Sequence, residues 1–160
     1  MIMKYPMYVD FAITPYCNLS CNFCYAEANE KIKSSKQILT LEEIRKIFTE
    51  FDQLGVMRVG FEGGEPFLRG DWYEIFKLAD QHCFNYFVNT NGTLIDVNIA
   101  KKLKNTNIDK VCVSLDGSNS KIHDMSRGKN GTFDLTIRGI KNLINEGYSG
   151  SVVCTPIGLM

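Results

Sequence analysis

Short β-rich runs alternate with longer amphipathic runs along the whole chain. Residues 41–54 give the strongest helical pattern, because apolar residues recur at helical intervals between a capping box that begins at Thr40 and a stop at Gly55. Asp71 and Asp96 are typical residues for the start of two further helices. The predicted helices contain 41–54, 72–79, 99–103 and 133–144, and the predicted strands are 8–13, 56–61, 85–88, 110–115 and 151–154.

This alternation predicts an α/β fold in which parallel strands are joined by helical crossovers. Two architectures remain open at this point: an open doubly wound sheet, and an open partial (β/α) barrel with five β-α units. Neither a linker nor a repeat divides the chain, so residues 1–160 are expected to form one domain.

The net charge and the hydropathy of the chain limit the kinds of partner that it can bind. The chain has 18 lysine and arginine residues against 18 aspartate and glutamate residues, so it lacks the basic surplus that binds nucleic acid or an anionic membrane. Its apolar stretches are far shorter than the roughly 20 residues that span a bilayer, and Lys4 and Asp10 interrupt the N-terminal segment. We therefore expect a soluble, cytoplasmic protein.

The unusual residues come where predicted strands end. In parallel α/β folds, loops at the carboxyl ends of strands converge on one rim and carry ligands and catalytic groups. Four such segments follow the first four strands in order: a cysteine-rich loop at 15–25, Glu-Gly-Gly-Glu-Pro at 62–66, Asn-Thr-Asn-Gly at 89–92, and Ser-Leu-Asp-Gly at 114–117.

The first segment holds Cys17, Cys21 and Cys24, spaced C-x3-C-x2-C. Three thiolates this close in sequence can surround one iron-sulfur cluster and leave one iron open to an exogenous ligand. Redox-active thiols or a zinc site are the alternatives, although His82 and His123 are far along the chain and make a closed zinc site harder to build. The remaining cysteines are expected to be small buried core residues; they are Cys83, Cys112 and Cys154.

The second segment suits an ammonium ligand. Gly63 and Gly64 allow close approach of the backbone, and Glu65 adds a carboxylate, although two glycines after a strand also form plain turns. Ser114 and Asp116 lie two residues apart, so their side chains are expected to face the same side and could together bind hydroxyl groups, such as those of a sugar. The alternative is a plain Asp-Gly turn in which Asp116 bonds its own backbone.

Two other segments are more ambiguous. Asn91 followed by glycine is typical of a plain turn, which is sufficient to account for this segment. The alternative is that the side chains of Asn89 and Thr90 point into the rim. In the predicted loop before the last helix, Arg127 suits a carboxylate or is simply solvated, and His123 either titrates near neutrality or makes a local hydrogen bond.

The cysteine loop followed by Gly-Gly-Glu-Pro resembles the radical S-adenosylmethionine (SAM) superfamily. The Ser-Leu-Asp-Gly, His-Asp, Arg-Gly and Gly-Thr-Phe-Asp segments resemble its branch of peptide and sulfatase maturases of the SPASM type. The resemblance implies a 4Fe-4S cluster on Cys17, Cys21 and Cys24, with SAM on the open iron. It also implies these cofactor contacts: Phe23 near adenine, Gly63, Gly64 and Glu65 at the methionine ammonium, Ser114 and Asp116 near the ribose, and Arg127 at the carboxylate.

The resemblance further implies an activity: reductive cleavage of SAM to a 5′-deoxyadenosyl radical that abstracts hydrogen from a peptide or protein side chain. A reductant such as a flavodoxin or ferredoxin would supply the electron, and no residue is assigned as the catalytic acid or base. Modification of a small metabolite or cofactor precursor is one alternative, and a non-catalytic iron-sulfur or zinc-binding module is another.

The chain departs from the family pattern at its C-terminal end. The family core has six β-α units and this branch adds a cysteine-rich extension, whereas the sequence stops near its fifth predicted strand. A fifth strand at an open edge would expose unpaired backbone groups, so we expect a piece of a longer protein.

Overall fold

The computed structural model describes residues 7–26, 38–148 and 151–153. Its centre is a five-stranded, wholly parallel sheet in which the strands lie in sequence order. Sequential order excludes a doubly wound sheet and confirms the open partial barrel. The strands are β1 (Tyr8–Thr14), β2 (Arg58–Gly63), β3 (Asn85–Thr90), β4 (Lys110–Ser114) and β5 (Ser151–Val153).

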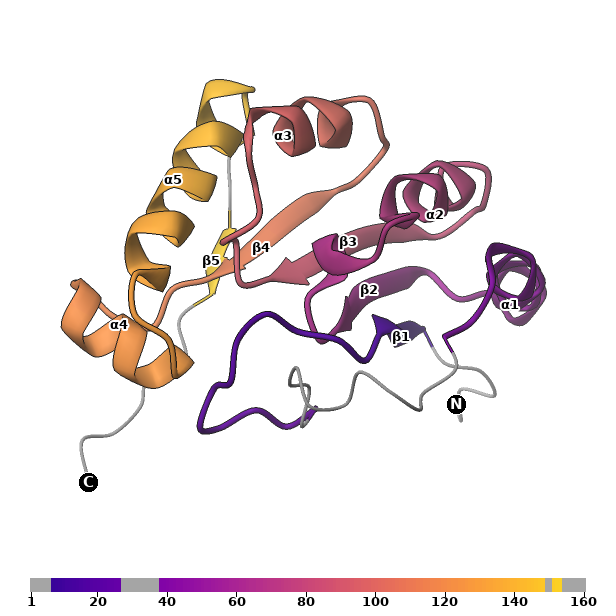
Figure 1. Ribbon diagram of the computed structural model, residues 1–160. Helices are drawn as coiled ribbons and strands as arrows, with labels where there is room; N and C mark the ends of the chain where they lie inside the picture. The colour runs from indigo at the N-terminus through magenta and orange to yellow at the C-terminus, as the bar shows by residue number, and fades with distance from the viewer. Residues whose placement is uncertain (1–6, 27–37, 149–150, 154–160) are drawn as a thin grey trace.

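The helices form an outer layer that arcs around one face of this sheet, and α4 lies beside the rim (Figure 1). They are α1 (Leu41–Leu54), α2 (Trp72–Ala79), α3 (Val97–Lys104), α4 (Ser120–Arg127) and α5 (Thr132–Asn145), with a short 3-10 helix η2 (Pro66–Leu68) after β2. The predicted capping box of α1 is confirmed, since Thr40 accepts from the Glu43 amide and the Glu43 carboxylate accepts in return.

The sheet has one apolar and one mixed face. Side chains that alternate along the strands, such as Val59, Phe61 and Val88, are fully buried against the helices together with Ile44 and Phe48. The opposite face carries partly exposed polar and aromatic side chains. They include Tyr8, Asp10, Glu62, Phe87, Asn89 and Ser114. A barrel interior of this kind leaves room for a ligand beside the strand ends.

Three predictions about elements were wrong. Residues 120–127 form a helix, not a loop. The second strand begins at Arg58 instead of Val56, because Val56 is buried in the connection after α1, where its amide bonds the Phe51 carbonyl. Asp71 precedes α2 without capping it, since its carboxylate accepts from the Arg69 guanidinium instead.

The outer helices are short. Within the described ranges, no helix combines the length and apolar character that crossing a membrane requires.

Candidate functional site

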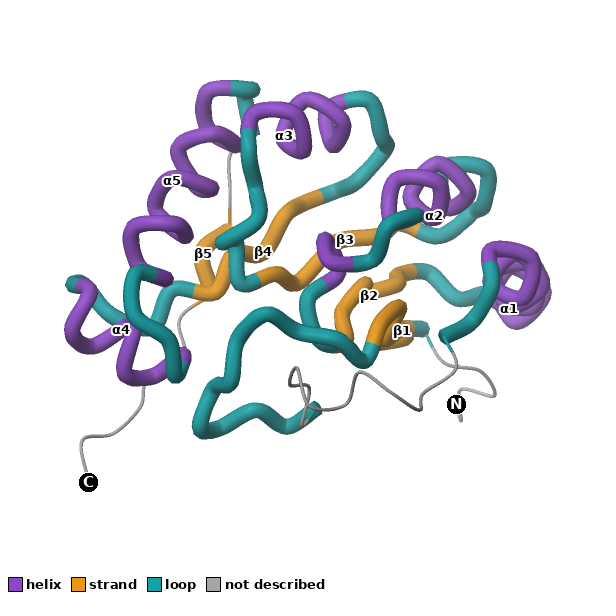
Figure 2. Tube along the Cα trace, in the orientation of Figure 1, coloured by secondary structure: helices purple, strands orange, loops and turns teal. Residues whose placement is uncertain are grey.

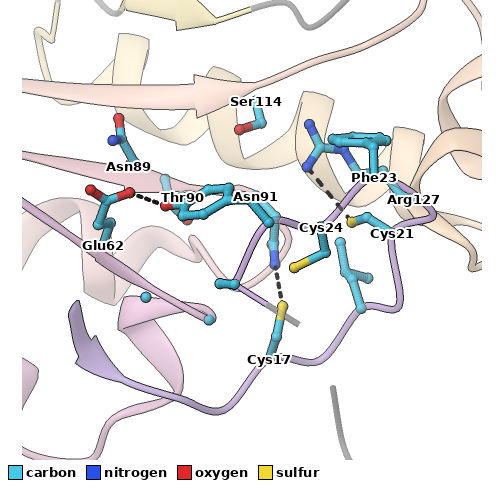
Figure 3. A pocket seen from close by; sticks show the side chains of 15 residues that line it. Cys17, Cys21, Phe23, Cys24, Glu62, Asn89, Thr90, Asn91, Ser114 and Arg127 are labelled. Carbon is cyan, nitrogen blue, oxygen red and sulfur yellow. Dashed lines mark hydrogen bonds between the residues drawn. The ribbon is translucent and has the colours of Figure 1, made fainter. Parts of the chain in front are cut away.

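A cavity of about 240 Å³ opens at the carboxyl ends of the strands. The loop after β1 runs below these ends toward α4 (Figure 2), and the three cysteines of that loop line the cavity (Figure 3). The other lining residues are Leu19, Phe23, Tyr25, Ala26, Glu62, Gly63, Gly64, Asn89, Thr90, Asn91, Ser114 and Arg127. All four segments that the sequence places at this rim therefore contribute to one cavity.

The two glycines after β2 anchor the cysteine loop. The Gly64 amide donates to the Thr14 carbonyl at 2.8 Å, and the Glu65 amide donates to the Tyr16 carbonyl at 2.7 Å. A Cβ on Gly63 would lie 2.2 Å from the Thr14 oxygen, and one on Gly64 would lie 2.0 Å from the Tyr16 oxygen. The predicted close approach is thus an approach of the cysteine loop's own backbone, while both glycines also line the cavity.

Glu65 is buried and does not line the cavity. Its Oε1 accepts from the Thr90 hydroxyl at 2.7 Å, and its Oε2 accepts from the Asn91 amide at 2.8 Å. Burial raises the pKa of Glu65 to about 7, although these donors act in the opposite direction. Glu65 ties the end of β2 to the end of β3, and contact with a SAM ammonium stays a prediction.

The raised pKa of Glu65 predicts a pH-dependent stability. The unfolded carboxyl titrates near its ordinary value of 4.5, so the folded state holds the proton up to a higher pH and loses stability as pH rises from about 4.5 to 7. We expect the difference in unfolding free energy between the wild type and Glu65→Gln to fall by about 3 kcal/mol over this range. Urea denaturation of both proteins at pH 4.5 and 8 measures it, and parallel pH profiles would contradict it.

Arg127 is held from three sides at the other end of the cavity. Its Nη2 donates to Oδ1 of Asp116 at 2.7 Å, and its Nε lies 2.7 Å from Oδ2 as an ion pair without hydrogen-bond geometry; both side chains are almost fully buried. The guanidinium carbon lies 5.4 Å from the centre of the Phe23 ring, and Nη1 lies 3.8 Å from the sulfur of Cys21. Arg127 therefore lines the cavity, and its predicted contact with a SAM carboxylate stays a prediction.

Asp116 is buried and does not line the cavity. Besides Arg127, its carboxylate accepts from the Ser126 hydroxyl at 2.6 Å, and its side chain has no solvent exposure. Its backbone amide donates to Nδ1 of the buried His123, whose pKa is lowered by burial. The geometry makes Asp116 a support for Arg127, whereas Ser114, two residues earlier, does line the cavity.

The cysteines outside the C-x3-C-x2-C loop differ in burial. Cys112 is buried on β4, as predicted, whereas Cys83 is exposed, so the prediction of a buried residue there was wrong. Its backbone amide bonds the Asp52 carboxylate, which places it in the surface turn after α2. Cys154 lies outside the described residues. Among the residues that the structure describes, only Cys17, Cys21 and Cys24 bring sulfur to the cavity.

Sequence reasoning missed two polar residues in the cavity. Glu62 accepts a hydrogen bond from the Tyr25 hydroxyl, and burial together with nearby Asp10 raises the pKa of Glu62. Both residues stand beside predicted ligands, Tyr25 directly after Cys24 and Glu62 directly before Gly63. This position in the sequence could have identified them, because residues next to a ligand-binding turn lie at the same rim of the sheet.

The donor set suits a cluster better than a single ion. In the described part of the chain, no three histidine, cysteine or acidic side chains converge closely enough to hold one metal ion, although three thiols line the same cavity. Burial raises the pKa of Cys17 to about 11 and also raises that of Cys21. The thiols of Cys17 and Cys21 are therefore protonated without metal and release protons when they bind it.

Comparisons with known proteins agree with this geometry. The sequence profile of the Radical SAM superfamily matches residues 11–160, so the chain belongs to that superfamily. Its members are enzymes that bind a 4Fe-4S cluster and SAM, which confirms the predicted class and cofactors at the level of the family.

The chain is similar to curated proteins with different named activities and to a solved structure. Mycofactocin maturase MftC of Mycolicibacterium smegmatis is 32% identical over 92% of this chain and 37% of that protein. Fe-coproporphyrin III synthase of Methanosarcina barkeri is 38% identical over 87% of this chain and 34% of that protein. SuiB of Streptococcus suis, solved with SAM and also with its precursor peptide SuiA, shares the fold with a TM-score of 0.80 at 22% identity, over 92% of this chain and 33% of SuiB.

The chain thus spans a little over a third of the curated relatives it matches. The matched residues, 11–160, include the cysteine loop and the glycine-rich turn.

Proposed function

We propose that this chain is the cofactor-binding core of a radical SAM enzyme that modifies a peptide or protein side chain. The observation that carries the proposal is the single cavity in which Cys17, Cys21 and Cys24 meet Gly63 and Gly64. In this proposal the three cysteines bind three irons of a 4Fe-4S cluster. When bound and reduced, the cluster supplies the electron that converts SAM to methionine and a 5′-deoxyadenosyl radical, which abstracts hydrogen from the substrate.

The remaining lining residues bind and orient SAM in this proposal. The backbone of Gly63 and Gly64 offers polar groups to its ammonium group, and Glu65 contributes through the position it gives that turn. Arg127 offers its guanidinium to the carboxylate while Asp116 holds the planar group in place. Ser114, which lines the cavity, offers its hydroxyl to the ribose, and Phe23, which is 39% exposed, offers an aromatic face to adenine.

Two substrate classes are favoured by different relatives. The name of MftC and the SuiB complex with a precursor peptide support a peptide substrate. The name of Fe-coproporphyrin III synthase, which has the higher identity of the two curated relatives, supports a small cofactor precursor as the second candidate. A flavodoxin or ferredoxin as reductant, and a cytoplasmic location, belong to the same proposal.

The test is anaerobic reconstitution of the protein followed by dithionite reduction in the presence of SAM. We expect about four irons and four sulfides per chain and formation of 5′-deoxyadenosine. One zinc per chain without labile sulfide would overturn the proposal in favour of a structural metal module. With ordinary SAM and deuterated candidate substrates, transfer of deuterium into 5′-deoxyadenosine distinguishes a peptide donor from a porphyrin precursor.

A further inference from the structure

A closed ring of side-chain hydrogen bonds joins the cysteine loop to the end of β3. Asn18, directly after the first cysteine, donates from Nδ2 to the Thr93 hydroxyl at 2.9 Å. That hydroxyl donates to Oδ1 of Asn91 at 2.6 Å, and Nδ2 of Asn91 donates to Oδ1 of Asn18 at 2.9 Å. Every donor in the ring faces an acceptor, so the ring has one self-consistent direction.

The orientation of the Asn91 amide is fixed independently of the ring. The backbone amide of Thr93 also donates to Oδ1 of Asn91, at 2.9 Å, which assigns the oxygen and leaves Nδ2 on the other side. One hydrogen of Nδ2 is directed to Asn18, and the nitrogen lies 4.0 Å from the sulfur of Cys17 (Figure 3). The second hydrogen is therefore available to the first cysteine sulfur.

The backbone of Asn91 is also held in place, which keeps the side-chain donor near the sulfur. Its amide donates to the buried carboxylate of Glu65 at 2.8 Å, and its carbonyl accepts from the Thr136 hydroxyl at 3.0 Å. Asn91 itself is 7% exposed. A preorganised donor held from two sides costs little to orient when the sulfur carries charge.

We propose that Asn91 raises the reduction potential of the cluster by donating an N–H···S hydrogen bond to the Cys17 thiolate. The inference rests on the proposed function, because it assumes a cluster on Cys17. Reduction adds negative charge that spreads onto the thiolate sulfurs, so a donor at sulfur stabilises the reduced state more than the oxidised state. The Asn-Thr-Asn-Gly-Thr segment then has a role beyond its turn: its second asparagine acts on the cluster, and the backbone amide of its second threonine orients that asparagine.

The experiment compares Asn91→Leu with Thr93→Val in the reconstituted protein. Leucine has a similar shape but removes the donor, whereas valine breaks the ring and retains the Thr93 backbone amide that orients Asn91. We expect the ratio of reduced to oxidised cluster at a fixed potential to fall by about fivefold in Asn91→Leu, the effect of one hydrogen bond. In Thr93→Val we expect it to stay within about twofold of the wild type. Potentiometric titration followed by electron paramagnetic resonance measures the ratio.

Two results would overturn the inference: an unchanged ratio in Asn91→Leu at full iron content, or an equal change in both variants, which would make the ring merely structural. Should Asn91→Leu not retain its cluster, the wild type labelled with ¹⁵N-asparagine decides. Pulsed resonance of the reduced cluster is expected to show coupling to an asparagine nitrogen, and its absence would refute the bond. A wild type that assembles no cluster refutes the proposed function instead, so the two failures are distinguishable.

Discussion

Cys24→Ala is expected to lose the iron-sulfur absorbance after reconstitution and to lower 5′-deoxyadenosine formation by more than about 100-fold. The reason lies in the donor set: three thiols line the cavity, and removing one leaves a cluster with two protein ligands. Within the described part of the chain, Cys83 and Cys112 are both away from the cavity lining and so cannot replace the lost sulfur. Iron and sulfide content per chain and the yield of 5′-deoxyadenosine measure the effect.

Cys83→Ala is the matched control. Cys83 is an exposed thiol in the turn after α2, and its contact with Asp52 is made by the backbone amide, which the substitution retains. Iron content and product yield are therefore expected to equal those of the wild type. Full cluster content in Cys24→Ala would show that these three cysteines are not the ligands, and equal losses in both variants would indicate a general effect of removing a thiol.

Sequence periodicity predicted the α-helices whose buried faces are apolar and missed α4, whose buried face is polar. In α4 the buried residues are His123, Ser126 and Arg127, so no apolar stripe marks this helix. Its end signals were present nevertheless. The Asn119 side chain accepts from the Ile122 amide at the start, and Gly128 ends the helix in the left-handed conformation.

The rim itself was predictable from the sequence, because the position of a residue after a parallel strand decides which edge it occupies. Whether a side chain faces the ligand or the protein was not. Glu65 and Asp116 both sit at the predicted edge, yet their carboxylates are taken up by Thr90 and Arg127, 25 and 11 residues further along the chain. Such choices depend on which distant donors the fold brings near, and local sequence does not contain that information.

Gly64→Ala is expected to release the cysteine loop from the sheet while Gly70→Ala, a few residues later, leaves it in place. A Cβ at position 64 would meet the Tyr16 oxygen at 2.0 Å and the Cys17 nitrogen at 2.9 Å. Both atoms belong to backbone, so no side-chain rotation relieves the overlap. We expect a loss of about 1–3 kcal/mol in the unfolding free energy of the cluster-free protein, the usual cost of overpacking.

The effect on the cluster should exceed the effect on stability, since the displaced backbone leads directly into Cys17. Gly64→Ala is expected to bind less than half the iron of the wild type, as iron analysis after gel filtration measures it. At Gly70 a Cβ has no neighbour within 4 Å, so Gly70→Ala should keep full iron content and change stability by less than about 0.5 kcal/mol. If Gly64→Ala retained a full cluster and wild-type stability, the contact between Gly64 and the cysteine loop would not be what holds Cys17 at the cavity. The ring of Asn18, Asn91 and Thr93, together with the contact of Arg127 with Cys21, would then have to be sufficient to hold the loop.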